Sequence, residues 1–199
     1  LARLGKRVLC IDMDIGLRNL DISLGLSDRA LMDFSDVAEG RCPLARAAVT
    51  HPDLPNLSLL TAPMSLSPDV TATRIRALLR TARDRYDYIM IDSPAGLGPG
   101  FRALVVATND ASSLRDAQRT VEELYRIRQV HLVMNRIQPR LLRQLRTTID
   151  DAMDAAGLPL IGVIPEDRRV ILAANLGRPL ILEGRQGAAN ACLNIAKRL

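Results

Sequence analysis

The run KRVLCID, residues 6–12, is short, apolar from Val8 onward, and ends in a carboxylate. A continuous apolar run without polar alternation is typical of a parallel strand that is buried on both faces. Similar runs predict further strands at residues 56–62, 88–92, 103–108, 130–135 and 160–164. Before the first strand, LARL followed by Gly5 indicates the last turn of a helix closed by a left-handed glycine.

Amphipathic patterns separate these strands and predict helices at residues 71–85, 113–126, 141–156 and 187–199. In the first of them, Ile75, Leu78 and Ala82 share one face and arginines occupy the other. Strands that alternate with helices predict an α/β fold: a doubly wound, mostly parallel sheet with helices on both faces. In such a sheet, ligands bind beyond the carboxyl ends of the strands.

The link between Asp92 and Ala103 is too short for this fold. A parallel crossover needs about a dozen residues, usually as a helix. Only ten residues separate these two positions, and prolines and glycines make up half of them. We therefore expect a segment to be missing near residues 101–103. Because the helix turn that ends at Gly5 needs a beginning, we also expect residues to be missing before Leu1. A β-hairpin at residues 92–103 is the alternative, although its strands lack the polar alternation of a half-exposed hairpin.

The length, charge and composition of the chain limit the functions that it can have. The 199 residues fit one domain, and the net charge of +5 favours an anionic partner such as a nucleotide, nucleic acid or acidic membrane. An arginine-rich solvated surface is the alternative. Aromatic residues make up only 3% of the chain, which argues against a surface that stacks bases. No apolar run reaches the length of about 18 residues needed for a transmembrane helix, and no signal peptide is visible.

The cysteines Cys10, Cys42 and Cys192 are widely spaced and form no C-x-x-C pair. This spacing argues against a disulfide framework and against a simple zinc or iron–sulfur site. We expect reduced thiols and a cytoplasmic protein.

Carboxylates follow two of the predicted strands. Asp12 and Asp14 are separated by one residue, and Gly16 permits a sharp turn after them. Such carboxylates can order the water shell of a metal or position an attacking water, whereas the alternative is a turn capped by Asp. Asp92 ends another strand, with Gly96 four residues later, in a Walker-B-like arrangement in which Asp holds Mg²⁺ through its waters.

Polar groups also follow two later strands. Asn135 and Arg136 end one strand, and Pro165, Glu166 and Asp167 end the next. An Asn amide offers both a donor and an acceptor, which suits the edge of an adenine. The alternative is an Asn that caps the following helix.

Together these stretches resemble the MinD-type ATPases, within the larger group that includes the ParA partition proteins. DMDIGLRNLD at residues 12–21 is similar to their switch I, and DSPAG at residues 92–96 is similar to their Walker B and switch II. SLRD, NR, GVIPED and NLGRP follow in the family's order. The likeness covers nearly the whole chain and implies a P-loop NTPase-like fold of the SIMIBI class, with ATP and Mg²⁺ as cofactors.

The resemblance implies a role for each matched residue near the phosphates. Asp14 would orient the hydrolytic water, and Asp12 would lie in the outer shell of Mg²⁺. Asp92 would be the Walker B carboxylate that holds the metal. Gly96 would sense the γ-phosphate.

At the base, the resemblance implies that Asn135 contacts adenine, with Arg136 beside it. The backbone after Pro165, at Glu166 and Asp167, would complete the nucleotide contacts.

The departure from the family is the deviant Walker A loop, glycine-rich with two lysines, which this sequence lacks. Backbone N–H groups and a Lys must cradle the phosphates. We therefore expect residues 1–199 alone to bind ATP weakly and to hydrolyse almost none, and we expect the parent protein to possess the loop. The family's C-terminal amphipathic membrane helix is also absent from this sequence.

The resemblance implies an ATP-dependent homodimer that binds division regulators and an anionic membrane, and so positions the septum from the inner face of the cell membrane. A flagellar-number regulator is a close variant. A partition ATPase would instead bind DNA, through arginines on residues 71–85 and at Arg136, Arg140, Arg143 and Arg146. A non-enzymatic scaffold fits the absent loop, but it does not explain why three site carboxylates are present.

Overall fold

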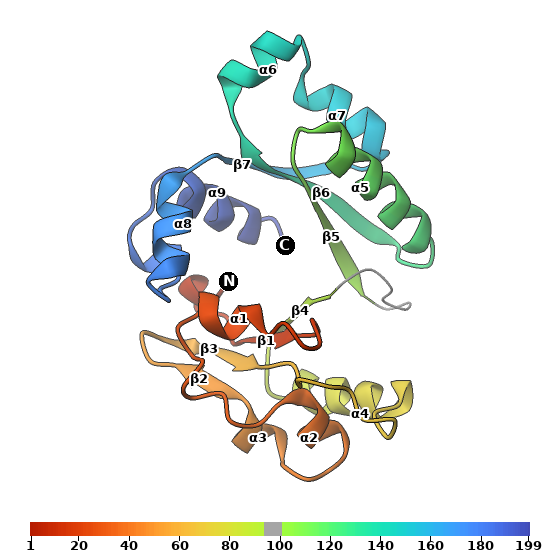
Figure 1. Cartoon of the computed structure of the whole chain (residues 1–199), viewed down its shortest axis with the longest axis vertical. Coiled ribbons are helices and arrows are strands. Elements are labelled where there is room, and N and C mark those ends of the chain that lie inside the picture. Colours follow the sequence, from red (N-terminus) through yellow and green to blue (C-terminus); the bar gives the residue numbers. More distant parts are fainter. Residues whose placement is uncertain (94–100) are drawn as a thin grey trace. The chain divides into compact units, whose positions relative to one another are not determined.

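The computed structural model describes residues 1–93 and 101–199 (Figure 1). The chain divides into two compact units, each with its own sheet. The first unit comprises Leu1–Pro94 and Leu172–Pro179, and the second comprises Ala95–Ile171 and Leu180–Leu199.

The first unit contains a four-stranded sheet in the order β2-β3-β1-β4. Its strands are β1 (Val8–Asp12), β2 (Val49–His51), β3 (Leu54–Leu60) and β4 (Tyr88–Asp92). β1 pairs in parallel with both β3 and β4, whereas β2 is antiparallel to β3. The three parallel strands confirm the prediction. β2 was not predicted, because an edge strand of three residues has no readable apolar period.

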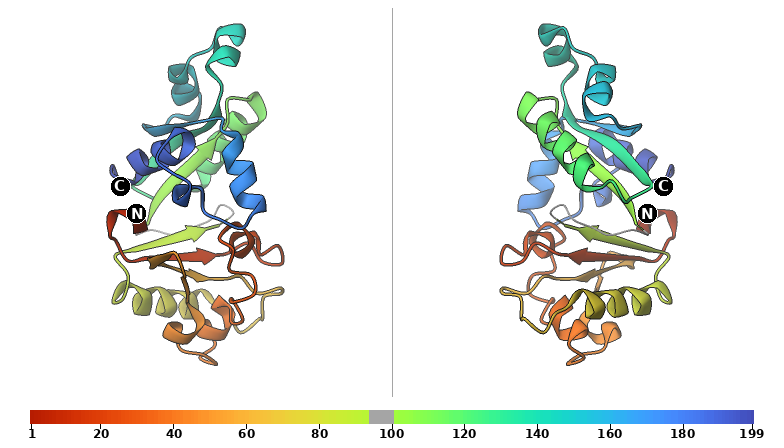
Figure 2. Two further views of the ribbon diagram at one scale, coloured as in Figure 1. Left: turned by 90° about the vertical axis from the view of Figure 1, so that its left-hand side faces the viewer. Right: turned by 90° about the vertical axis from the view of Figure 1, so that its right-hand side faces the viewer.

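Helices of the first unit cover one face of this sheet. They are α2 (Phe34–Ala38), α3 (Leu44–Ala47) and α4 (Ala72–Arg83), and Figure 2 shows them on the same side of the strands. Phe34, Leu44 and Leu78 pack there against the buried side chains of β1 and β3. A 3-10 helix, η1 (Ala2–Leu4), ends at Gly5 with φ 80°, which confirms the predicted glycine cap.

The second unit contains a three-stranded parallel sheet in the order β5-β6-β7. Its strands are β5 (Arg102–Ala107), β6 (Gln129–Ile137) and β7 (Leu160–Pro165). α5 (Ala111–Glu123) and α7 (Ile149–Ala156) pack on one face, and α9 (Gly187–Ala196) packs on the other (Figure 2). A Cβ on Gly162 would lie 2.4 Å from Cγ1 of Ile195, so this position admits only glycine without repacking. Helices on both faces confirm the doubly wound prediction for this sheet.

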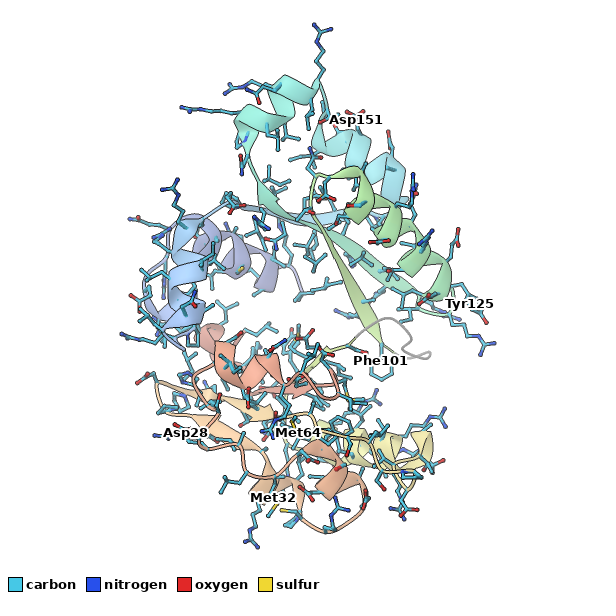
Figure 3. The ribbon with its side chains drawn as sticks, viewed as in Figure 1. Asp28, Met32, Met64, Phe101, Tyr125 and Asp151 are labelled. Carbon is cyan, nitrogen blue, oxygen red and sulfur yellow. The ribbon has the colours of Figure 1, made fainter. Side chains whose placement is uncertain are left out.

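The single helix predicted at residues 141–156 is wrong, because two helices occupy this stretch. α6 (Pro139–Leu145) ends at Arg146, whose φ of 52° is left-handed. α7 then begins with a capping box, in which Thr148 N donates to the Asp151 carboxylate at 2.7 Å and Asp151 N donates to Thr148 Oγ1 at 3.2 Å. Asp151 is labelled in Figure 3. A Thr followed three residues later by an Asp is a signal for the start of a helix. Here a new helix starts at that signal, although the helical spacing of apolar residues continues across it.

The hairpin alternative at residues 92–103 stays a prediction, because its turn falls on residues 94–100 and its two strands belong to different units. β4 pairs in parallel with β1, and β5 pairs in parallel with β6. Residues 94–100, which include Gly96, lie outside the described residues. All three cysteines are free, as expected. Within residues 1–93 and 101–199, no helix combines the length and the apolarity required to cross a bilayer.

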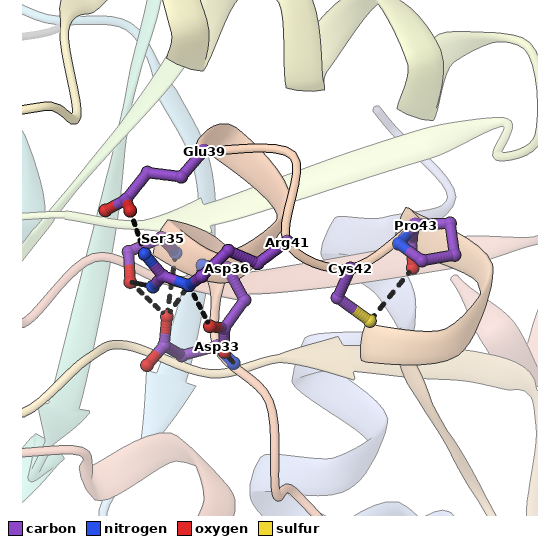
Figure 4. A network of polar contacts seen from close by, with 7 residues as sticks. All are labelled: Asp33, Ser35, Asp36, Glu39, Arg41, Cys42 and Pro43. Carbon is purple, nitrogen blue, oxygen red and sulfur yellow. Dashed lines mark hydrogen bonds and ion pairs between the residues drawn. The ribbon is translucent and has the colours of Figure 1, made fainter.

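A polar network fixes the start of α2 (Figure 4). Asp33 accepts hydrogen bonds from the backbone N of Ser35 and Asp36 at 2.8 and 3.2 Å, and Asp36 accepts one from Asp33 N at 3.0 Å. Arg41 donates from Nε to Asp36 at 2.9 Å and also contacts Glu39. These bonds satisfy N–H groups that a helix start leaves without partners.

Candidate nucleotide-binding site

Three carboxylates gather at the carboxyl edge of the first sheet. Asp12 and Asp92 end adjacent strands and are register partners, and Met13 N donates to the carbonyl O of Asp92 at 2.8 Å. Asp14 follows two residues after Asp12. The side chain of Asp12 is buried, whereas Asp14 is half-buried and Asp92 is exposed. The structure therefore brings these three predicted site residues to one edge of one sheet.

Asp12 uses both carboxylate oxygens to fix the loop that follows it. Oδ1 accepts from Asp14 N at 2.9 Å, and Oδ2 accepts from Leu20 N at 3.3 Å in the first turn of α1 (Asn19–Ser23). The turn-and-cap alternative is thus confirmed for Asp12. This local role also holds the backbone of Asp14 in place.

The loop after Asp14 is held by backbone contacts. Gly16 has φ 88°, and its N donates to the carbonyl O of Pro63 at 3.1 Å. The carbonyl O of Asp14 accepts from Leu17 N at 3.3 Å. The side-chain carboxylate of Asp14 has neither a hydrogen bond nor an ion pair with another residue in the described part of the chain. It is therefore available to a ligand.

The charge at this edge is not balanced. Although Asp92 as a whole is exposed, its carboxyl group is partly shielded from water. This desolvation, and then the neighbouring carboxylates of Asp12 and Asp14, raise the pKa of Asp92 above its ordinary value. Among residues 1–93 and 101–199, no group of three or more His, Cys, Asp or Glu side chains is arranged to hold a metal directly. Oxygen donors with excess negative charge but without a closed ligand set fit a Mg²⁺ ion that keeps most of its waters.

Sequence reasoning missed an ion pair inside the switch I motif. Arg18, with φ 49°, donates from Nη2 to Asp21 at 3.4 Å and to the carbonyl O of Ala30 at 3.1 Å. Asp21 is 4% exposed, and its Oδ1 has no partner among the described residues. The sequence did contain a signal for this ion pair, because Arg18 and Asp21 carry opposite charges and are three residues apart at the start of a helix.

A contact between two glycines joins distant motifs within the first unit. Gly25 follows α1, and Gly177 follows α8 (Arg168–Asn175). A Cβ on Gly25, whose φ is 65°, would lie 2.0 Å from the carbonyl O of Gly177. Only two glycines can approach so closely. Residues 24–26 (LGL), which follow the switch I motif, and the NLGRP stretch therefore meet through their backbones.

In the second unit, the predicted base contacts form a connected group. Arg136, with φ 55°, donates from Nε to Glu166 Oε2 at 3.0 Å, and Arg136 N donates to Asn135 Oδ1 at 2.9 Å. Glu166 N donates to the carbonyl O of Ile137 at 3.1 Å. The residue before α6 is Gln138, so the alternative in which Asn135 caps that helix is wrong.

Asp167 has a structural partner set of its own. It forms an ion pair with Arg169 at 2.7 Å and accepts from Ala188 N at 3.1 Å, at the start of α9. The hydrogen bonds from Arg169, and then from Ala188 N, lower the pKa of Asp167 far below its ordinary value. A Cβ on Gly187 would lie 2.4 Å from Asp167 Oδ2, so this glycine makes room for the contact. Pro165, which precedes this group, is the last residue of β7.

Comparison with known proteins identifies the family. The model of the CobQ/CobB/MinD/ParA nucleotide binding domain matches residues 1–180. The septum site-determining protein MinD of Synechocystis sp. is 39% identical over 212 aligned residues, which cover 100% of this chain and 80% of that protein.

Two solved structures share the fold. In the MinC:MinD cell division protein complex of Aquifex aeolicus, one chain matches with 34% identity and a TM-score of 0.85, over 99% of this chain and 84% of that chain. The septum site-determining protein MinD of Pyrococcus horikoshii, solved with Mg-ADP, matches with 24% identity and a TM-score of 0.80, over 99% of this chain and 84% of that chain. From its fold and its sequence, this chain belongs to the MinD-type ATPases of the CobQ/CobB/MinD/ParA nucleotide-binding family.

Proposed function

We propose that the complete protein is an ATP-dependent dimerising switch that positions the division septum. The observation that carries this proposal is the acidic edge of the first sheet, defined as Asp12, Asp14 and Asp92. Its excess negative charge matches a site that receives a divalent cation and a nucleotide. The septum-site role of the Synechocystis relative supports the cellular function.

At the phosphate end, Asp92 and Asp12 hold Mg²⁺ through the metal's waters. The bound metal neutralises charge on the phosphates. Asp12 also anchors Asp14 through the bond to its backbone N. Asp14 orients the attacking water, because positioning contributes more to phosphoryl transfer than a strong base does. Gly96 is the proposed sensor of the γ-phosphate.

At the base end, Asn135 contacts adenine with its amide, and the backbone after Pro165 completes the contact. Arg136 and Glu166 lie beside the base, and the ion pair between them fixes the side of the base site. We assign Asp167 a positioning role, because its carboxylate is occupied by Arg169 and by the start of α9.

The proposal concerns one nucleotide-binding domain that includes the family's phosphate-binding loop, which residues 1–199 do not contain. On their own, these residues would bind ATP weakly and turn over almost none. The alignment with the Synechocystis protein is longer than this chain, which supports an omitted segment such as the one proposed near residues 101–103. Every assay of turnover therefore uses the full-length protein.

The proposed partners are a second copy of the protein, bridged by ATP, a MinC-like division regulator, and an anionic membrane on the cytoplasmic side, reached through a C-terminal helix. The regulator is suggested by the Aquifex relative, which was solved together with MinC. The septum-site relatives do not favour a partition or flagellar role.

Co-sedimentation of the full-length protein with anionic liposomes, in ATP and in ADP, tests this function. The proposal predicts pelleting in ATP and release in ADP. The variant Asp14→Ala should pellet in ATP and remain bound, because hydrolysis is blocked. If the protein pelleted in neither nucleotide, the membrane switch would be wrong, and ATP-dependent DNA binding would then support the partition alternative.

A further inference from the structure

The carboxylate of Asp14 is placed only through the backbone of its loop, because the carboxylate itself has no bond within the described residues. On one side, Asp14 N donates to Asp12 Oδ1 at 2.9 Å. On the other side, the carbonyl O of Asp14 accepts from Leu17 N and Arg18 N at 3.3 and 3.4 Å, which are long hydrogen bonds. The position of the carboxylate therefore depends on how firmly residues 17 and 18 are held.

The backbone of Arg18 has a conformation that its side chain disfavours. Its φ of 49° and ψ of 54° are left-handed, which is unfavourable for a residue that carries a Cβ. Arg18 is the residue before α1, yet its side chain does not cap that helix. A strained backbone conformation persists only where the surrounding contacts impose it. The contacts of the Arg18 side chain are therefore the ones that keep this part of the loop in place.

The Arg18 side chain connects the loop after Asp14 to two later segments. Its Nη2 donates to Asp21 Oδ2 at 3.4 Å, in α1, and to the carbonyl O of Ala30 at 3.1 Å, on the way to α2. The side chains of Arg18 and Asp21 are 25% and 6% exposed, and Ala30 is buried. Shielding from water strengthens the attraction between the two charged side chains.

Stability alone does not account for this ion pair. Asp21 Oδ1 is buried without a hydrogen-bond partner among the described residues, and burial of such an oxygen is unfavourable. A buried ion pair often stabilises a fold less than apolar side chains of similar volume would. The contribution that remains is the selection of one conformation for the loop that carries Asp14.

We propose that Asp21 is a positioning residue for ATP hydrolysis, which acts by holding Arg18 and, through it, the backbone of Asp14. The inference rests on the proposed role of Asp14 in orienting the attacking water. Without the ion pair, Arg18 leaves the left-handed conformation, and the hydrogen bonds to the carbonyl O of Asp14 are lost with it. A displacement of a reacting group by about 1 Å slows a reaction by roughly a hundredfold.

The variant Asp21→Asn, which keeps the shape of the side chain but removes its charge, tests the proposal in the full-length protein. We expect the kcat for ATP to fall by at least about tenfold, while KM changes by less than about twofold because no nucleotide contact is altered. Asp36→Asn is the matched control, since it breaks the ion pair with Arg41 in the same unit and should leave kcat unchanged. Equal losses of kcat in both variants, or a rise in KM as large as the fall in kcat, would overturn the proposal.

A second variant, Arg18→Gly, distinguishes the loss of the ion pair from a folding defect. Glycine adopts a φ of 49° without strain, so the loop keeps its backbone conformation but loses the side chain that fixes it. We expect kcat to fall by at least about tenfold here too. Turnover at the wild-type rate would show that the left-handed backbone alone positions Asp14, and the proposal would be wrong.

The double variant separates this inference from the proposed function. In protein that already carries Asp14→Asn, Asp21→Asn should lower kcat by less than about twofold further, because the carboxylate that it positions is gone. A full additional loss would show that Asp21 acts by another route. If Asp14→Asn slowed turnover and Asp21→Asn did not, only this inference would fail. If Asp14→Asn left turnover unchanged, the proposed catalytic carboxylate and this inference would both be wrong.

Hydrogen exchange in the nucleotide-free, full-length protein measures the positioning without turnover. The peptide that covers residues 14–20 should exchange faster in Asp21→Asn than in wild type, because the hydrogen bonds from Leu17 N and Arg18 N are lost. The same peptide should exchange at the wild-type rate in Asp36→Asn. Exchange of residues 14–20 that is equal in Asp21→Asn and wild type would contradict a role of Asp21 in holding this loop.

Discussion

The carboxyl edges of the two sheets differ in whether their acidic side chains are paired with arginine. At the end of β1 and β4, carboxylates neighbour one another, and the pKa of Asp92 is raised. At the end of β6 and β7, each carboxylate has an arginine: Glu166 pairs with Arg136, and Asp167 pairs with Arg169. The first edge is thus completed by a cation from outside, whereas the second edge is already neutral and ordered.

The contacts that fix the loops at each edge differ accordingly. Backbone contacts fix the loops around the acidic edge, at Gly16 with Pro63 and at Gly25 with Gly177, which leaves the Asp14 carboxylate available. At the second edge, a carboxylate side chain itself connects the elements: Asp167, directly after β7, accepts a hydrogen bond from Ala188 N at the start of α9. Glycines at the first edge and acidic side chains at the second should therefore be the sensitive positions.

The largest effect on stability is expected for Gly25→Ala. The added Cβ would collide with the carbonyl O of Gly177, and the left-handed φ would add strain. We expect the free energy of unfolding to fall by about 3 kcal/mol or more, measured by urea denaturation. Gly40→Ala is the control, because Gly40 has φ 79° and open space, so only about 1–2 kcal/mol should be lost. Equal losses would show that the two glycines do not form a required contact.

Asp14→Asn in the full-length protein should reduce ATP turnover by about a hundredfold, because the attacking water loses its orienting charge. ATP affinity should change little. The exposed Asp28, labelled in Figure 3, provides the control: Asp28→Asn removes the same charge from the same unit and should leave turnover unchanged. Turnover that is equal in wild type and Asp14→Asn would exclude Asp14 as the catalytic carboxylate.

The two edges should give pH effects of opposite sign. The raised pKa of Asp92 means that its ionisation costs stability as the pH rises, so Asp92→Asn should raise the Tm at pH 7 in metal-free buffer. The lowered pKa of Asp167 means that its contribution is present above about pH 4 and is lost at lower pH, so Asp167→Asn should lower the Tm at pH 7. Both differences should shrink below about pH 4. Shifts of the same sign would contradict the contrast between the edges.

The smallest effect tests the division of residues 139–156 into two helices. Thr148→Ala removes the side chain that caps α7 and should cost about 1 kcal/mol in chemical denaturation. Thr120→Ala is the comparison, because the Thr120 hydroxyl only donates to the carbonyl O of Asp116 inside α5. If α6 and α7 were one continuous helix in solution, Thr148→Ala would be neutral or stabilising.

Much of the fold could be read from the sequence, because buried parallel strands are continuous apolar runs. All six predicted strands are present, and KRVLCID corresponds to β1. Short elements such as α1, α2 and α3 were missed, since four or five residues carry too little periodicity. The break before Thr148 was missed because Leu142, Leu145 and Ile149 continue a helical period across it.

The acidic edge was predictable for a similar reason. Parallel strands end at the same edge of a sheet, so the sequence predicted that Asp12 and Asp92 lie at such an edge. The pairing of β1 with β4, which brings the two residues together, is seen only in the structure. The partners of Asp167 were not predictable, because Ala188 and Gly187 are distant in sequence and carry no chemical signal. The same holds for the contact between Gly25 and Gly177, which depends on tertiary packing alone.

The dependence of ATP hydrolysis on Mg²⁺ concentration, in wild-type and Asp92→Asn full-length protein, tests the acidic edge most directly. The account predicts that hydrolysis requires Mg²⁺ and that the variant needs at least about tenfold more of it for half-maximal rate, because one carboxylate has been removed. An unchanged Mg²⁺ dependence in Asp92→Asn would show that the acidic edge does not hold the metal, and the assignment of the phosphate end would be wrong.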